Sequence, residues 1–309
     1  MVDSKKQLGL ICAFGIWLFS AVEIVAAKLS WLEQIQVETF AELRELERFQ
    51  LKAAEAFYTK SEFAAAAAEY EKFITLYESS HGAAYAQLMW SHCQVRQRKV
   101  YTAIRDGFRS VIDYWPESHE AKLSAYLIGQ SYKSIGEIKK AEAAYGKAIT
   151  AHPVDHIAVL SKWDMAEIAR IRKDAKRLAQ VWSDLVFNTK LNRQNRTYIE
   201  RAAQGLAKHH FAKPDFAKAR NALEVLYSDD ALVDAIYQNA KEAVSHLCSD
   251  GKTRRSGEQL ANRIITLLLD ETLEIKPSGN GADEIREWFR RAARLHERAG
   301  RDLDVIKTY

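Results

Sequence analysis

The sequence KLSAYLIGQSYKSIGEIKKAEAAYGKAITAHPVD, residues 122–155, predicts two helices joined by a tight turn. Each half carries small, aliphatic or aromatic residues at the spacing that places them on one helical face. They are Ala125, Ile128, Gly129 and Tyr132 in the first half, and Ala141, Tyr145 and Ala148 in the second. Gly136 lies between the halves, where the chain must reverse, and Pro153 stands where the second helix must end. We therefore predict an antiparallel helix hairpin with small residues at the crossing.

The second half of this hairpin recurs along the chain. Its aromatic position is filled every 37 or 38 residues, by Tyr70, Phe108, Tyr145 and Trp182. Two further positions repeat at the same spacing, one filled by Phe63, Tyr101, Ile138 and Ala175, the other by Phe73, Val111, Ala148 and Leu185. Because aromatics at recurring positions fill the space between neighbouring repeats, we assign them to the core and not to a cofactor site. The pattern resembles the tetratricopeptide-repeat superfamily. That resemblance implies an all-α solenoid of antiparallel helix hairpins, wound as a right-handed superhelix.

The connection between repeats resembles a particular branch of this superfamily. Trp115-Pro-x-Ser118-x-x-Ala121, followed by Ala125-Tyr126-x-x-Gly129-x-x-Tyr132, is similar to the repeats of two groups of bacterial envelope proteins. One is the lipoprotein of the outer-membrane β-barrel assembly machinery, and the other is the periplasmic partner of the Tol–Pal system. The resemblance covers about residues 50–190. The chain departs from the lipoprotein because Gly-Leu-Ile precedes Cys12, whereas a lipidation site needs a small residue there.

Composition supports the helical class and excludes several others. Only 13 glycines and 4 prolines occur among 309 residues, too few for the turns of a β-sandwich or the glycine-rich loops of a nucleotide-binding fold. With 48% hydrophobic residues the chain is too apolar to be disordered. The net charge of +4 gives no reason to expect a nucleic-acid partner. Cys12, Cys93 and Cys248 lack zinc spacing, and we predict neither a metal nor a cofactor.

Residues 1–27 have the pattern of a signal peptide or a membrane anchor. Lys5 and Lys6 precede an uncharged run at residues 8–22, and small residues follow it, which is typical of a cleaved signal peptide. The segment from Leu8 to Ala27 is also just long enough to span a bilayer as a retained anchor, although Glu23 is costly there. A cleaved signal, a retained anchor and a buried helix stay open. We expect an exported protein, either periplasmic or membrane-anchored in the cell envelope.

The remaining chain divides into residues 28–190, an N-terminal helix plus regular repeats, and residues 191–309, divergent helical repeats. Apolar residues at helical spacing predict an N-terminal helix or helices that pack on the first repeat; they are Leu32, Ile35, Phe40, Leu43, Leu46 and Phe49. In the second part we predict a fifth hairpin at 198–211 and 216–227, a sixth at 233–247 and 258–273, and a helix at 284–298. A further repeat helix begins near residue 302 and is incomplete at Tyr309. Either the chain is truncated there or its last helix is a short cap.

Repeat solenoids bind partners along the concave face, which the first helix of each hairpin lines. In three successive repeats the positions expected to face this groove combine an aromatic residue with basic or amide residues. They are Tyr85, His92 and Arg96, then Tyr126, Gln130 and Lys133, then Trp163, Glu167 and Arg170. Such a row suits an extended peptide or helix with apolar and acidic side chains. The other interpretation is that Tyr126 and Trp163 pack inside the array and the basic residues are solvated.

The sequence contains no catalytic signature that we recognise, neither a nucleophile elbow, a zinc-protease motif nor a phosphate-binding loop. We therefore predict a non-catalytic scaffold that binds protein or peptide partners in the bacterial cell envelope, with membrane association through residues 8–27 left open. Two alternatives remain. The chain is a helical region of a larger, truncated enzyme that acts on the cell wall, or it is a membrane-anchored chaperone-like protein.

Overall fold

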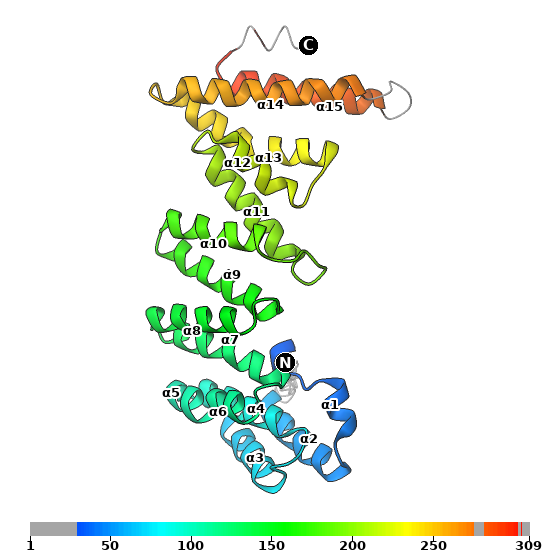
Figure 1. The fold of residues 1–309 in the computed structure, drawn as a ribbon, viewed down its shortest axis with the longest axis vertical. Helices are drawn as coiled ribbons and strands as arrows, with labels where there is room; N and C mark the ends of the chain where they lie inside the picture. Colours follow the sequence, from blue (N-terminus) through cyan, green and yellow to red (C-terminus); the bar gives the residue numbers. More distant parts are fainter. Residues whose placement is uncertain (1–29, 275–280, 302–303, 305–309) are drawn as a thin grey trace, which may run out of the picture. The chain divides into compact units, whose positions relative to one another are not determined.

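The structure is a computed structural model that describes residues 30–274, 281–301 and 304. All regular secondary structure in these residues is helical (Figure 1). The contacts divide the chain into two compact units, Met1–Arg98 and Lys99–Tyr309, here called unit 1 and unit 2. The predicted boundary near residue 190 lies inside unit 2 and stays a prediction. The predicted signal or anchor, from Leu8 to Ala27, lies outside the described residues. Within those residues no helix is both long and apolar enough to cross a bilayer.

Unit 1 contains a short 3₁₀ turn and four helices. These are η1 (Trp31–Glu33), α1 (Val37–Glu42), α2 (Glu45–Thr59), α3 (Phe63–Leu76) and α4 (Ala83–Arg96). Helices α2, α3 and α4 pack in sequence around Tyr70 and Phe73, both fully buried, and the ring of Tyr85 meets Tyr70 edge to face at 6.4 Å. Where the sequence predicted an N-terminal helix or helices, the structure has three separate elements. The backbone is extended at Gln36 and Leu43, so the segment is broken into η1, α1 and α2.

The same break changes which apolar residues of this segment are buried. Leu43, at the break, is 4% exposed and belongs to the core of unit 1. Leu46 and Phe49 are 70% and 73% exposed, so these two do not pack on the first repeat as the pattern predicted.

Unit 2 is a stack of helix hairpins (Figure 1). It begins with one helix in three parts, α5 (Val100–Thr102), η2 (Ala103–Phe108) and α6 (Arg109–Tyr114). It continues with α7 (His119–Ser134), α8 (Ile138–Ala151), α9 (His156–Ile171), α10 (Ala175–Phe187), α11 (Arg196–Phe211), α12 (Phe216–Glu224), α13 (Asp229–Ser249), α14 (Arg254–Glu274) and α15 (Gly281–Arg298). The predicted fifth and sixth hairpins and the helix at 284–298 correspond to α11 through α15. The all-α class and the solenoid of antiparallel hairpins are confirmed within each unit.

The main repeating aromatic position is in the core, as predicted, although Trp182 is only partly buried. Tyr101, at the other repeating position, is 55% exposed, so its assignment to the core is wrong. Tyr70, Phe108 and Tyr145 are at most 1% exposed. In unit 2 glycines face two of these rings, Gly129 across the α7–α8 crossing within a hairpin and Gly205 across the α10–α11 crossing between neighbouring hairpins. An ideal Cβ built on Gly129 would lie 2.5 Å from Cδ1 of Tyr145, and one built on Gly205 would lie 2.7 Å from Cη2 of Trp182. Because real Cβ atoms do not approach so closely, only glycine fits at these two crossings.

Four hairpin turns share one backbone conformation. The second residue after the first helix of each hairpin has a positive φ, at Ser61 (64°), Arg98 (62°), Gly136 (77°) and Lys173 (57°). In the third hairpin Gly136 N donates to Lys133 O at 3.1 Å, and the N–H of the next residue donates to Tyr132 O at 3.0 Å. This pair of bonds is the Schellman cap, which favours glycine at the left-handed position. Only one of the four turns has a glycine there.

Residues 103–108 form a π-helical segment inside the helix from Val100 to Tyr114. This helix has one residue more than α3 or α8, the corresponding second helices of neighbouring hairpins. A π turn holds one extra residue without shifting the helix ends. The local widening therefore lets Val100 and Tyr114 keep the places that Phe63 and Leu76 have in α3. Val100, and not Tyr101 as the repeat spacing predicted, corresponds to Phe63.

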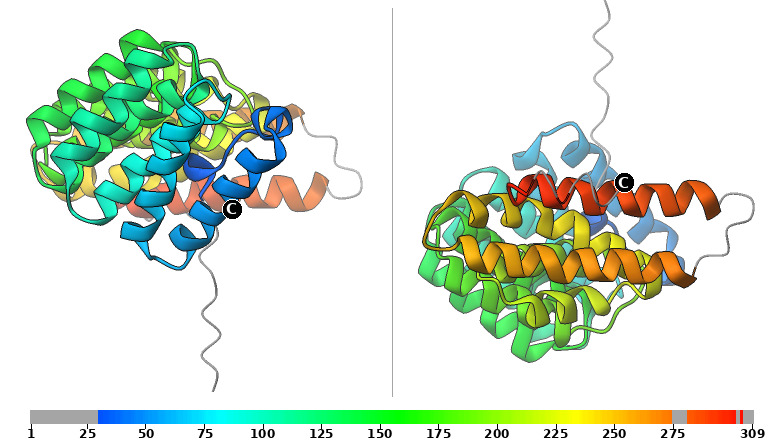
Figure 2. Two further views of the ribbon diagram at one scale, coloured as in Figure 1. Left: turned by 90° about the horizontal axis from the view of Figure 1, so that it is seen from below. Right: turned by 90° about the horizontal axis from the view of Figure 1, so that it is seen from above.

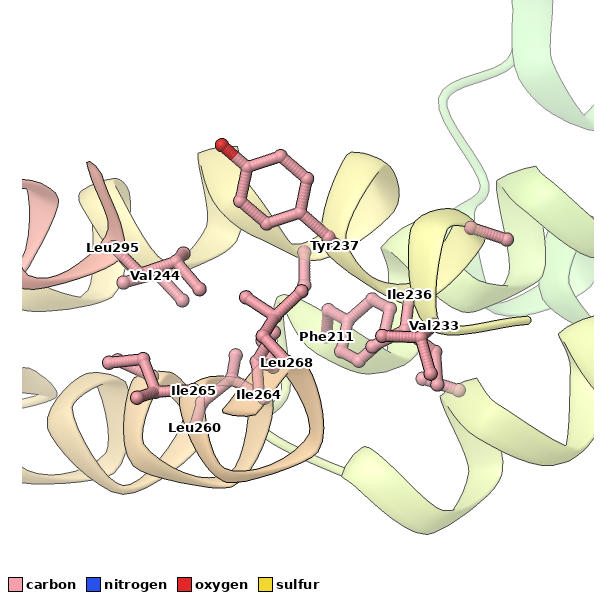
Figure 3. Packing of buried hydrophobic residues seen from close by; sticks show 14 of the residues in the cluster. Phe211, Val233, Ile236, Tyr237, Val244, Leu260, Ile264, Ile265, Leu268 and Leu295 are labelled. Carbon is pink, nitrogen blue, oxygen red and sulfur yellow. The ribbon is translucent and has the colours of Figure 1, made fainter. Parts of the chain in front are cut away.

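The last three helices of unit 2 enclose its largest apolar cluster (Figure 3). Helices α14 and α15 lie side by side (Figure 2), and Leu260, Ile264 and Leu268 of α14 pack toward α13. Arg291 of α15 forms an ion pair with Asp234 of α13 at 2.6 Å, so a polar contact also joins these helices.

Candidate partner-binding face

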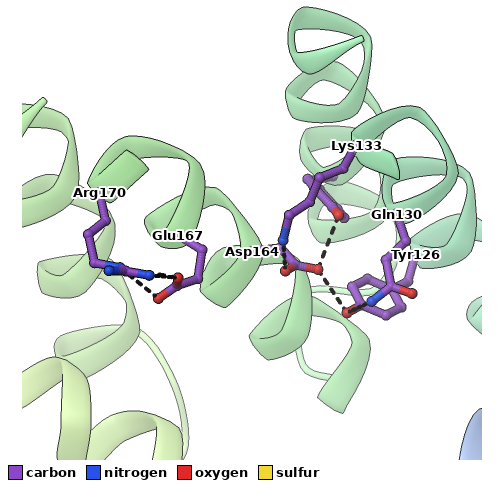
Figure 4. Close-up of polar contacts among 7 residues, drawn as sticks. Tyr126, Gln130, Lys133, Asp164, Glu167 and Arg170 are labelled. Carbon is purple, nitrogen blue, oxygen red and sulfur yellow. Dashed lines mark hydrogen bonds and ion pairs between the residues drawn. The ribbon is translucent and has the colours of Figure 1, made fainter. Parts of the chain in front are cut away.

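Helices α7 and α9 of unit 2 carry six of the nine predicted partner-binding residues. Tyr126, Gln130 and Lys133 lie on one face of α7, because residues three, four or seven positions apart are neighbours on a helix. They surround a residue that the sequence did not single out, Asp164 of α9 (Figure 4). The Tyr126 hydroxyl donates to Asp164 Oδ2 at 2.8 Å and Lys133 Nζ donates to Oδ1 at 2.6 Å. Gln130 Nε2 donates to the Tyr126 hydroxyl oxygen at 2.6 Å.

A second tyrosine completes the environment of Asp164. Tyr145 of α8 donates its hydroxyl to Asp164 Oδ2 at 3.1 Å. The carboxylate is only 7% exposed and so receives three donors from two helices. Because a buried charge without partners would be strongly unfavourable, this arrangement fixes α7, α8 and α9 relative to one another.

The electrostatics of this network suit a supporting role rather than a reactive one. Burial, reinforced by the nearby Asp164 charge, raises the pKa of Tyr126 and of Tyr145 well above the ordinary tyrosine value. Both hydroxyls therefore stay protonated at physiological pH and act as donors. Only the outer members reach solvent, since the Lys133 side chain is 31% exposed. The network holds Gln130 and Lys133 in fixed positions on the surface of α7.

The third predicted group lies one helix further along, on α9. Glu167 and Arg170 form a two-pronged ion pair, with Arg170 N–H groups 2.6 and 3.2 Å from Glu167 Oε2. The Arg170 side chain is 62% exposed, and the pair contributes little to stability at such exposure. Trp163 is partly buried and meets the Tyr198 ring of α11 edge to face at 5.5 Å. Charged groups are therefore on the surface of α9, while its aromatic residue also contributes to packing.

In unit 1 the predicted residues Tyr85, His92 and Arg96 converge on the chain's own Glu33. The Arg96 guanidinium is 3.4 Å from Glu33 Oε1, and the Tyr85 hydroxyl oxygen is 3.1 Å from the Glu33 carbonyl oxygen. His92 is buried, and desolvation lowers its pKa to about 4 although the Glu33 charge opposes this. The imidazole is therefore neutral at physiological pH.

Two of the predicted aromatics are not presented to solvent. Tyr85 is fully buried and Tyr126 is 5% exposed, so the expectation that their rings line an open groove is wrong. The register of the repeat explains Tyr85. Tyr85 lies two residues after Ala83, just as Leu123 lies two residues after the corresponding Ala121, and Leu123 is also fully buried. For Tyr126, packing against Tyr145 at 5.9 Å and the bond to Asp164 hold the ring inside. Whether these groups bind a partner stays a prediction.

Sequence reasoning missed Asp164, Glu33 and Tyr58, the residues that organise the two sites. Asp164 had no signal in the repeat, because the corresponding residue of α7 is Leu127. Glu33 did have one, since Ser30-x-x-Glu33 is a capping-box pattern. In the structure the Glu33 carboxylate does accept from the Ser30 backbone N–H at 3.0 Å.

Neither site contains a metal-ligating set. Among the described residues no three His, Cys, Asp or Glu side chains are grouped so that they could hold a metal ion. Cys93 and Cys248 are both free thiols, and burial raises the pKa of Cys93 to about 12.

No known protein-family profile matches the chain, and no curated protein sequence matches it. Among solved structures it is similar to a tetratricopeptide repeat protein from Parabacteroides merdae ATCC 43184, with 11% sequence identity and a TM-score of 0.39. The match covers 88% of this chain and 98% of that chain. The assignment of the fold therefore rests on the helix hairpins themselves.

Proposed function

We propose that this chain is a non-catalytic helical-repeat scaffold that binds protein partners in the bacterial cell envelope. One observation supports the scaffold role most directly. On α7 and α9 of unit 2, Gln130, Lys133, Glu167 and Arg170 form a polar surface, here called the α7–α9 face. The Asp164 network holds Gln130 and Lys133 from inside, and Arg170 is bonded to Glu167. A surface whose side chains are already ordered loses less conformational entropy on binding than a mobile one.

The chemistry of this face indicates the kind of partner. Lys133 and Arg170 keep exposed cationic groups next to carboxylates of the chain itself, and the Glu167 side chain is 28% exposed. A partner segment with acidic side chains would exchange contacts with these cations, and apolar side chains would meet the partly buried Trp163. Charged groups of this kind set specificity and association rate more than affinity.

A charge swap tests this role in the full chain. Glu167→Arg with Arg170→Glu keeps the ion pair, the net charge and the helix, but reverses the charge pattern of the α7–α9 face. The matched control is the reversed pair Arg220→Glu with Glu224→Arg on α12, which forms a similar exposed ion pair at 2.6 Å. Proteins captured from a native envelope fraction and identified by mass spectrometry are the readout. Capture of a partner by wild type and control, but not by the α7–α9 swap, supports the proposal. Equal capture by all three, together with equal capture by Trp163→Ala, overturns the assignment of this face.

The envelope location is proposed from the pattern of residues 1–27. Cell fractionation and the mass of the mature N-terminus test it. A start at Lys28 indicates a cleaved signal, whereas an intact N-terminus in the membrane fraction indicates an anchor. An intact chain found only in the cytosol would overturn this part of the proposal.

A further inference from the structure

The turn at residues 30–34 belongs to no helix hairpin, yet one of its side chains is buried in unit 1. Glu33 is 7% exposed, whereas Trp31 beside it is 47% exposed. The Tyr58 hydroxyl of α2 donates to Glu33 Oε1 at 2.6 Å, and the Arg96 guanidinium of α4 approaches the same oxygen at 3.4 Å. The turn is therefore attached through this carboxylate and through its backbone, since the Glu33 carbonyl oxygen lies 3.1 Å from the Tyr85 hydroxyl and the Leu32 backbone is hydrogen-bonded to His92.

The surface that receives this carboxylate is built from α2 and α4. Tyr58 donates its hydroxyl to the carboxylate, Arg96 supplies a cation that is 55% exposed, and the neutral His92 lies beside them. The Tyr85 hydroxyl oxygen lies 3.1 Å from the backbone carbonyl oxygen of Glu33 and donates to Glu55 of α2 at 2.7 Å. Burial alone would raise the pKa of Glu33, but the hydrogen bonds from Tyr58 and from the Ser30 backbone hold it below the ordinary value. The site therefore accommodates an ionised carboxylate, which is the chemistry of a glutamate or aspartate side chain.

The fold of unit 1 does not depend on this turn for its apolar core. The buried core residues are Leu43 and residues of α2, α3 and α4; Ile35 and Phe40, which follow the turn, pack against them, and no residue of 30–34 belongs to the cluster. A ligand that offered the same carboxylate in the same turn could take the place of residues 30–34 without opening the hairpins. The tether gives the chain's own turn a high local concentration, on the order of millimolar, so a free ligand must compete against it.

We propose that the α2–α4 surface of unit 1 is a recognition site for a glutamate-bearing peptide turn of a protein partner, and that residues 30–34 occupy it as a built-in competitor. The proposal extends the scaffold function to a second surface. It rests on the proposed function only because it assumes a protein partner. It also assigns a role to Arg96, whose exposed cation is the first group that an incoming carboxylate would meet.

Peptide binding to the full chain tests this directly. The probe is a fluorescein-labelled peptide SWLEQIQVE, which copies residues 30–38, and the readout is fluorescence anisotropy. Glu33→Ala removes the buried carboxylate of the resident turn, so this variant should bind the probe at least tenfold more tightly than wild type. A peptide with Gln in place of the Glu that corresponds to Glu33 should bind neither protein. Adding Arg96→Ala to Glu33→Ala should weaken probe binding about tenfold, since a charge-assisted contact is lost.

Two results would overturn the proposal. One is equal binding by wild type and Glu33→Ala, and the other is binding that is insensitive to Arg96→Ala and to the Gln peptide. Should Glu33→Ala fail to fold, wild type gives the answer by hydrogen exchange: excess probe at millimolar concentration must speed exchange at the Ser30 and Glu33 amides, and unchanged exchange refutes the idea. The assay contains no cellular protein, so its failure is distinct from a failure of the α7–α9 face to capture partners.

Discussion

Gly129 and Gly146 are both helical glycines of the third hairpin, but substitution by alanine should change stability in opposite directions. Nothing lies within 4 Å of a Cβ built on Gly146, whereas a Cβ on Gly129 would lie 2.5 Å from Cδ1 of Tyr145 and closer still to Cε1. The Tyr145 ring cannot easily move aside. It is fully buried, and its hydroxyl is bonded to Asp164 at 3.1 Å.

The magnitudes follow from two opposing terms. Alanine in place of a helical glycine stabilises a helix by about 1 kcal/mol, and at Gly146 this is the only term. At Gly129 the same gain is opposed by overpacking, which costs about 1–3 kcal/mol and is expected at the upper end because the opposing ring is anchored. We therefore expect Gly146→Ala to stabilise by about 1 kcal/mol and Gly129→Ala to destabilise by about 2 kcal/mol.

Native-state hydrogen exchange of the α7 and α8 amides measures this difference locally, which avoids assuming that both units unfold together. A gap of about 3 kcal/mol corresponds to more than a hundredfold difference in the opening equilibrium of these helices. Equal protection in the two variants would mean that Tyr145 can be displaced at no cost. The packing explanation for Gly129 would then be wrong.

Four further changes test other features of the structure. Lys173→Gly should stabilise by about 0.5–1 kcal/mol, because the left-handed position favours glycine, and Gly136→Ala should destabilise by a similar amount; denaturant midpoints measure both. The pKa of His92 is lowered to about 4, so the unfolded chain binds more protons than the native one below pH 6.5. The stability of unit 1 should thus fall by about 2 kcal/mol between pH 6.5 and 5, and exchange of the α4 amides in His92→Gln should lose this dependence. Asp164→Ala leaves buried donors without an acceptor and should lower the free energy of unfolding by about 3 kcal/mol, measured by thermal unfolding. An unchanged unfolding midpoint would show that the network has no structural role. Because burial raises the pKa of Cys93 to about 12, alkylation at neutral pH, mapped by peptide mass spectrometry, should be far slower there than in the denatured chain.

The helix hairpins could be predicted because their signals are local and repeated. Small residues at the crossings, aromatics at a spacing of 37 or 38 residues and prolines outside the helices all agree on one arrangement. In the N-terminal segment the predicted packing is wrong for Leu46 and Phe49, and the reason is physical. The apolar spacing of this segment suits a helix, but the chain is extended at Leu43, which turns Leu46 and Phe49 toward solvent.

The sites were less predictable, because each depends on a carboxylate that the repeat does not specify. Asp164 replaces a leucine of the previous repeat, and Glu33 reaches α4 from more than 60 residues away in sequence. Helical register identified the residues that surround these carboxylates, since Tyr85, His92 and Arg96 do converge. It could not indicate that the group they converge on belongs to the same chain.

The π-helical segment at residues 103–108 has a consequence for how such repeats are compared. An insertion in a repeat protein is usually expected in a loop, and a gap placed there pairs Tyr101 with Phe63. Here the extra residue is taken up inside a helix, so the residue-by-residue correspondence with α3 shifts partway along that helix. At its start Val100 corresponds to Phe63, and at its end Tyr114 corresponds to Leu76. Alignment methods that allow gaps only between helices will misplace half of this helix. Length variation within helices is therefore one way in which repeats of this kind can diverge in sequence while their hairpins keep the same packing.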